Sequence, residues 1–179
     1  MGILIVLVLM AAAAFLGYVS LVNRFARLSV KIGESASGVD VALTRRWDTL
    51  TKMIDVTKGY ARYEAGALSS VVKLRQGMSM MERNDASARM DELTGRLNVL
   101  VENYPDLKAS ESFTQLQQAV REAEEHLQAA RRVYNMNVSR FNQLLASWPA
   151  GVVGRGRGYV PAEFFQAEER KRGDVSMEF

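Results

Sequence analysis

One stretch of the chain determines the organisation of the rest: residues 3–22 read ILIVLVLMAAAAFLGYVSLV. No ionisable side chain occurs between Gly2 and Asn23. Because a helix rises about 1.5 Å per residue, a run of about 20 apolar residues spans the ~30 Å hydrocarbon core of a bilayer. The sequence therefore predicts a transmembrane anchor over residues 1–23, to which the more polar remainder of the chain is attached.

Two other interpretations of this run stay open, a cleaved signal peptide and a buried core helix. A signal peptide has a positively charged start, a short apolar core and a small-residue cleavage site. Here no Lys or Arg precedes the run, and apolar residues continue beyond Ala11 to Ala14. The sequence therefore favours the retained anchor.

The charges that flank the anchor predict its orientation. Arg24, Arg27 and Lys31 follow the run within ten residues, whereas only the terminal amine precedes it. Positively charged flanks stay on the cytoplasmic side of a membrane. We therefore expect a single-pass protein whose soluble domain lies in the cytoplasm, with Tyr18 near the inner interface.

Composition argues against several classes of site. The chain has 179 residues, no cysteine and one histidine, so disulfides and thiolate metal sites are excluded. A di-metal site in a helical bundle needs Glu-x-x-His on two helices, and the carboxylates near His126, namely Glu122, Glu124 and Glu125, cannot provide that. We predict no metal site, no cofactor and no catalytic residues, and hence no enzyme.

The basic residues favour a lipid partner over nucleic acid, because the formal net charge is only +3 and part of the excess lies beside the anchor. Five of them are expected to contact lipid headgroups: Arg24, Arg27, Lys31, Arg155 and Arg157. The last two lie in the segment GVVGRGRG, residues 151–158, which we predict to be a mobile loop. A solvated connector and a short RNA-binding segment are the alternatives for that loop.

Apolar residues at three- and four-residue steps predict helices over residues 24–83, 86–103 and 110–148. We expect turns at Gly77–Asp85, with Asn84 or Asp85 as the next helix cap, and at Tyr104-Pro105-Asp106. Pro161 should begin a short helix that runs through Arg172. The inward positions expected in the last long helix are Phe113, Leu116, Val120, Ala123, Leu127, Ala130, Tyr134, Val138, Phe141, Leu145 and Trp148.

These segments predict an all-α protein with an N-terminal transmembrane helix and an elongated antiparallel bundle of three to four long helices. The bundle should occupy residues 24–148, and residues 149–179 should hold the glycine-arginine loop, a short helix and a tail. The helix count stays open, because the middle helix is too short to return the chain along one unbroken first helix. Either the long helices overhang, or the first stretch turns back near Asp48 to Lys52.

Several polar residues have predicted structural roles. Two basic pairs, Arg45-Arg46 and Arg131-Arg132, are expected to make ion pairs across helices with acids such as Asp48 and Glu124. The alternative is a site for an anionic partner. Tyr134, Asn135 and Asn142 lie on or beside the inward stripe, and buried polar groups are hydrogen-bonded. Their expected role is to fix helix register.

Three motifs, in order, resemble those of LemA proteins, over nearly the whole chain. The first is VDVALTRRWDTL at residues 39–50, followed by Lys58-Gly59-Tyr60-Ala61 and Glu64. The second is YPDLKA at residues 104–109, and the third is RRVYN at residues 131–135 with Phe141-Asn142 and Trp148-Pro149. At Thr51-Lys52 the family usually has Pro-Asn, so this chain departs from the pattern there.

The resemblance implies a bacterial protein of the cell (inner) membrane, with a helical-bundle domain and no established enzymatic activity. We predict a scaffold or adaptor that acts through protein–protein interaction, and the alternative is a membrane-tethered signalling or stress-response regulator. Self-assembly is expected because small residues, Ala11 to Ala14 and Gly17, let transmembrane helices approach closely. The sequence does not identify other protein partners.

Overall fold

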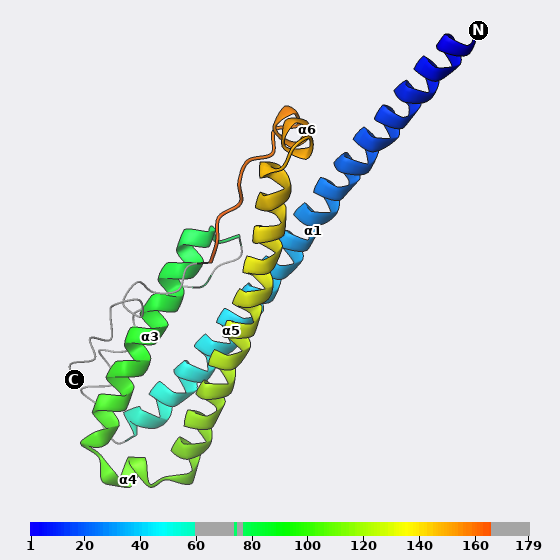
Figure 1. Ribbon diagram of the computed structural model, residues 1–179. Coiled ribbons are helices and arrows are strands. Elements are labelled where there is room, and N and C mark those ends of the chain that lie inside the picture. Colours follow the sequence, from blue (N-terminus) through cyan, green and yellow to red (C-terminus); the bar gives the residue numbers. More distant parts are fainter. Residues whose placement is uncertain (60–73, 75–76, 166–179) are drawn as a thin grey trace, which may run out of the picture. The chain divides into compact units, whose positions relative to one another are not determined.

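The structure is a computed structural model, and it describes residues 1–59, 74 and 77–165 (Figure 1). Its helices are α1 (Gly2–Lys58), α3 (Met80–Glu102), α4 (Pro105–Lys108), α5 (Glu111–Ala146) and α6 (Ala150–Gly156). No strand occurs among these residues, which confirms the predicted all-α class. They form two compact units: a first unit of residues 1–37 and 133–164, and a second unit of residues 38–132 with residue 165.

Helix α1 carries the apolar run with which the chain begins. Residues 1–20 are all exposed. The most apolar 18-residue window of α1 has a mean hydropathy of 2.6, and none of it is buried. By length and composition this helix can cross a membrane. Because the window is exposed, it is not a core helix of this chain, and the interpretation as a buried core helix is wrong.

The end of α1 differs from both predicted alternatives. The helix passes through residues 48–52 without a turn and continues to Lys58, so the predicted reversal there is wrong. One unbroken helix to residue 83 is also wrong, because Gly77 has a φ of +76° and α3 begins at Met80. That backbone conformation favours glycine and interrupts a helix. The part of the prediction that concerns residues 60–73 and 75–76, including Glu64, lies outside the described residues.

Helix α3 begins earlier than predicted because a capping box fixes its start. The backbone N–H of Glu82 donates to Ser79 Oγ at 3.2 Å, and the backbone N–H of Ser79 donates to Glu82 Oε2 at 2.7 Å. Two free donors at the helix start are thereby satisfied at once, and the carboxylate lies at the positive end of the helix dipole. Asn84 and Asp85, the predicted caps, lie inside the helix.

The predicted inward faces of α3 and α5 are largely correct. Met90, Leu93, Leu97, Leu100 and Val101 of α3 are all buried. On α5 the buried positions of the predicted stripe are Phe113, Val120, Ala123, Leu127, Tyr134, Val138, Phe141 and Leu145. Trp148 is the clear error, since 86% of it is exposed. Helix α5 ends at Ala146, so helical periodicity no longer determines where Trp148 points.

Ion pairs in the second unit define the directions of its helices. Asp40 of α1 pairs with Arg83 of α3 at 2.6 Å, and Arg46, further along α1, pairs with Asp91, further along α3. The two helices therefore run in the same direction, as Figure 1 shows. The sequence predicted a turn at Gly77–Asp85 that joined the first long helix directly to the next one. Such a turn would have placed those two helices antiparallel to each other.

An aromatic cluster forms the core of the first unit. The Phe25 ring of α1 stacks on Tyr159 with centroids 5.2 Å apart and meets Phe141 of α5 edge-on at 5.8 Å. Leu144, Leu145 and Ala150 complete the buried cluster. The residues after α5 therefore fold back and close over both long helices.

The segment predicted to be a mobile glycine-arginine loop is mostly helix α6. Gly154 is buried, and a Cβ atom there would lie 2.7 Å from Leu145 Cδ1 and 2.7 Å from Phe25 Cζ. Real Cβ contacts are essentially never shorter than 3.0 Å. Glycine is therefore required at this position for close packing, and the abundance of glycine does not indicate mobility.

The chain beyond α6 is a strap, residues 159–164, along α5. Both sides of the Asn142 amide bind the backbone of Ala162: Nδ2 donates to the carbonyl at 2.9 Å, and Oδ1 accepts from the N–H at 2.8 Å. Tyr134 Oη donates to the carbonyl of Glu163 at 2.9 Å. Residues 161–165 are not helical, so the predicted helix start at Pro161 is wrong. The remainder of that prediction, to Arg172, lies outside the described residues.

We predict that Gly154→Ala lowers the free energy of unfolding by about 1–3 kcal/mol, because the added methyl group overpacks the contact with Phe25 and Leu145. Gly156→Ala is the matched control in the same helix, since in the described part of the chain no atom beyond its two neighbours and its own helix backbone lies within 4 Å of its Cβ position. That change should be neutral or should stabilise by up to ~1 kcal/mol. Denaturant unfolding of the full-length protein in detergent measures both, and equal stability of the two variants would contradict the close packing of α6.

Candidate functional site

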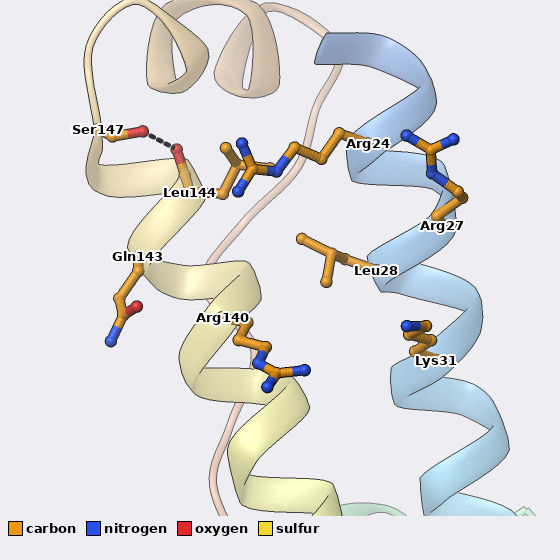
Figure 2. Close-up of a pocket in the computed structure, with 8 residues that line it drawn as sticks. All are labelled: Arg24, Arg27, Leu28, Lys31, Arg140, Gln143, Leu144 and Ser147. Atoms are coloured by element: carbon orange, nitrogen blue, oxygen red, sulfur yellow. Dashed lines mark hydrogen bonds between the residues drawn. The ribbon is translucent and has the colours of Figure 1, made fainter. Parts of the chain in front are cut away.

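A groove of about 450 Å³ lies in the first unit between α1 and the end of α5 (Figure 2). Helix α1 contributes Arg24, Arg27, Leu28 and Lys31, and the facing segment contributes Arg140, Gln143, Leu144 and Ser147. Each set follows the spacing i, i+3, i+4, i+7, which places side chains on one face of a helix. Two facing helical stripes therefore form the walls.

The two stripes meet because the helices pack antiparallel in this unit. Phe25 contacts Phe141, whereas Asn137, one turn earlier on α5, donates through Nδ2 to the Lys31 carbonyl at 3.3 Å and to Ser35 Oγ at 3.2 Å. Asn137 is buried, so these bonds satisfy its amide group and fix the register of the two helices. The register in turn determines which cation of α5 faces those of α1.

The groove has an apolar floor and cationic walls. Leu144 is buried and Leu28 is half-buried, and Figure 2 shows Leu28 pointing from α1 into the space between the helices. Arg24 reaches from α1 across towards Leu144, and Arg140 extends from α5 towards α1 (Figure 2). All four cationic side chains are exposed, so the site is open to solvent.

The cations of the groove are not neutralised by nearby acids. Within the described part of the chain, no ion pair involves Arg24, Arg27, Lys31 or Arg140. The first unit holds six basic and two acidic side chains, a formal charge of +4, although the whole chain carries only +3. Neighbouring like charges repel one another. Their convergence therefore marks this groove as the candidate site for an anion.

Three of the five predicted headgroup contacts, Arg24, Arg27 and Lys31, come together in the groove. The other two are elsewhere: Arg155 lies on α6, where its Nη1 donates to the Leu145 carbonyl at 3.3 Å, and Arg157 caps the end of α6. Arg140 is a groove residue that was not predicted from the sequence. The signal was its spacing to Gln143, Leu144 and Ser147, but only the helix register shows that this face meets α1.

A second group of charged side chains lies in the second unit and is internally paired. Arg46 is almost completely buried and pairs with Asp91 and with Glu124, the latter at 3.1 Å. The predicted cross-helix pairing of Arg46 with Glu124 is thus confirmed. Arg83 Nε and Nη2 each donate to the Asp40 carboxylate at 2.6 Å. These pairs join α1, α3 and α5, so we interpret them as structural.

Arg131, from the other predicted basic pair, is also held within the second unit. It donates to Ser87 of α3, and its guanidinium carbon lies 4.4 Å from the centroid of the Phe165 ring. A guanidinium over an aromatic face is a favourable cation–π contact. Arg131 therefore joins α5 to α3 and to the residue that follows the strap.

Comparison with known proteins gives one family and several relatives. A model of the LemA family matches residues 35–179. The chain is similar to protein LemA of Metamycoplasma hominis, with 31% identity over 163 residues, which cover 88% of this chain and 74% of that protein. It is also 29% identical over 83 residues to magnetosome protein MamQ 2 of Paramagnetospirillum magneticum, covering 46% of this chain and 30% of that protein. The family match includes Arg140 but begins after Lys31.

We predict that Arg46→Ala lowers the free energy of unfolding by about 3–5 kcal/mol, because it leaves the Asp91 and Glu124 carboxylates without their buried partner. The control is Arg96→Ala, which removes an exposed pair with Glu92 on the surface of α3 and should cost less than about 1 kcal/mol. Chemical denaturation measures both values. If Arg46→Ala proved as mild as the control, the cluster would not be part of the structural core.

Proposed function

The chain belongs to the LemA family, and from that premise we propose that it is a membrane-anchored scaffold or adaptor that acts by binding proteins, including copies of itself. One observation carries the proposal: a single helix, α1, is both the exposed apolar run and a core element of the folded part. Residues 1–20 are exposed, whereas Phe25 of the same helix is completely buried in the core of the first unit. Such a helix links an anchor to a binding domain without an intervening linker.

The chemistry of the described residues favours binding over catalysis. Among residues 1–59, 74 and 77–165, no three His, Cys, Asp or Glu side chains come together to hold a metal ion. The buried charges of the second unit are engaged with one another, and the groove offers cations without a nucleophile–base pair. These features support recognition of an anion or a protein surface.

The anchor itself supports self-assembly. Ala13 and Gly17 are spaced as in small-xxx-small motifs, which let two transmembrane helices pack closely. Apart from its two neighbours and the backbone of its own helix, no atom of the described residues lies within 4 Å of the Cβ position of Gly17, so this face of α1 is open to another copy.

The proposed location is the bacterial inner membrane, crossed once, with the folded part on the cytoplasmic side. The support is the distribution of charge around the anchor. Arg24, Arg27 and Lys31 follow the exposed run directly, and Arg140, Arg155 and Arg157 belong to the same unit. Basic residues within about 15–20 residues of a transmembrane helix end favour the cytoplasmic side.

Reporter fusions test this orientation. Alkaline phosphatase, which is active only outside the cytoplasm, should be inactive when joined to Phe179, whereas a green fluorescent protein at the same position should fluoresce. Reversing the three charges after the anchor, with Arg24→Glu, Arg27→Glu and Lys31→Glu, should increase the phosphatase activity at least severalfold. Strong phosphatase activity of the unaltered chain would reverse the assignment.

Mass measurement tests self-assembly. We predict that the full-length protein in mild detergent has the mass of a dimer or larger assembly, and that Ala13→Leu with Gly17→Leu shifts the population towards monomer by at least about tenfold, because larger side chains separate the helices. Val8→Leu with Val19→Leu is the control, since it keeps the run apolar and retains both small residues. A monomer at high protein concentration with the anchor intact would argue against a self-assembling scaffold.

A further inference from the structure

We infer that the groove between α1 and α5 binds the phosphate group of an anionic phospholipid, with Arg24, Arg27, Lys31 and Arg140 as its cationic ligands. The inference rests on the proposed membrane anchoring and adds to it a defined site, a ligand class and a residue from α5. The starting observation is that four cations from two helices converge on one groove without an acidic partner among the described residues.

The chemistry of the groove fits a phosphate diester. Guanidinium groups match the geometry of phosphate oxygens and bind them through paired hydrogen bonds, and the lysine ammonium adds a compact charge. Arg24 and Arg140 reach into the groove from opposite helices, as Figure 2 shows. A phosphate between them would relieve the mutual repulsion of these side chains. Gln143 and Ser147, which also line the groove, add polar groups at its margin.

The position of the groove along α1 matches the depth of lipid headgroups. The apolar run ends at Val22, and Arg24 follows within the next turn. From Arg24 to Lys31 the helix rises about 10 Å, at about 1.5 Å per residue. The headgroup layer on each side of a bilayer is about 5–8 Å thick. When residues 3–22 span the hydrocarbon core, the groove therefore begins at the level of the phosphates.

Apolar side chains beside the groove distinguish a lipid from a free phosphate ion. Trp148 follows the groove residue Ser147 and is 86% exposed, and Val152 on α6 is 59% exposed. Leu28 and Leu144 form an apolar floor beneath the cations. Tryptophan is enriched at membrane interfaces, where its ring sits at the level of the headgroups. A free phosphate ion cannot make apolar contacts with these side chains, whereas a phospholipid presents an anionic group and acyl chains together.

Native mass spectrometry of the full-length protein in neutral detergent tests the site. The probes are dioleoyl phosphatidylglycerol, which is anionic, dioleoyl phosphatidylcholine, which has no net charge, and inorganic phosphate. We expect phosphatidylglycerol to bind at least about tenfold more tightly than phosphatidylcholine, because each basic residue near an anionic group contributes about a fivefold preference. Millimolar inorganic phosphate should not displace it.

Two variants with the same loss of charge separate the groove from general attraction. The groove variant is Arg27→Gln, Lys31→Gln and Arg140→Gln, and the control is Arg45→Gln, Lys52→Gln and Arg132→Gln, all exposed side chains of the second unit. The groove variant should weaken phosphatidylglycerol binding roughly 10- to 100-fold, whereas the control should change it less than about threefold. Thermal unfolding should show both variants folded, and because both keep the anchor, their self-assembly should be unchanged.

Trp148 provides an independent readout. In the Trp47→Phe protein it is the single tryptophan, and brominated phosphatidylglycerol should quench its fluorescence more strongly than brominated phosphatidylcholine. The groove substitutions should remove that difference. Equal binding of phosphatidylglycerol by the groove and control variants, equal affinity for both lipids, or displacement by inorganic phosphate would each overturn the inference. Membrane insertion and assembly would be unaffected by any of these results, so the proposed function would still stand.

Discussion

The packing of Phe25 against α5, α6 and the strap is the contact on which the first unit depends. Phe25 is the first buried side chain of α1, and its ring contacts Phe141 and Tyr159. It also lies so close to Gly154 that a Cβ atom there would be only 2.7 Å from Phe25 Cζ. Because it lies one residue after Arg24, it fixes the basic stripe of α1 opposite that of α5. Overpacking at Gly154 would displace this ring and, with it, the geometry of the groove.

Much of the fold follows from the sequence, because burial in helices obeys a simple period. The predicted apolar faces of α3, and of α5 as far as Leu145, are largely buried as expected. In a helix, residues three and four apart lie on the same face, so the direction of each side chain can be predicted from its position in the sequence. The errors occur where two local rules compete. Glycines in residues 151–158 permit either a mobile loop or close packing, and only the neighbouring Phe25 decides between them. At the start of α3, the Ser79–Glu82 capping box prevails over two other good caps.

The candidate site shows a different limit of prediction. Arg24, Arg27 and Lys31 could be chosen from their position after the anchor, because that argument needs only one helix. Arg140 lies more than a hundred residues away in sequence, and its place in the groove depends on a register that the buried amide of Asn137 fixes. The two units also differ in how their basic side chains are paired. Arg46 of the second unit pairs with two carboxylates, whereas the cations of the groove have no such partner among the described residues.

The continuity of α1 has a consequence for how this chain can change over evolution. Each residue turns a helix by about 100°, so one inserted residue rotates everything on one side of it relative to the other. An insertion before Ala11 lengthens only the exposed run and leaves the spacing of Ala13 and Gly17 unchanged, so the anchor can adapt in length to bilayers of different thickness. Within the first unit, an insertion between Phe25 and Ser35 would turn Ser35 away from the Asn137 amide while Phe25 stayed packed against Phe141. Length variation should accordingly be tolerated near the start of α1 and excluded between these two contacts.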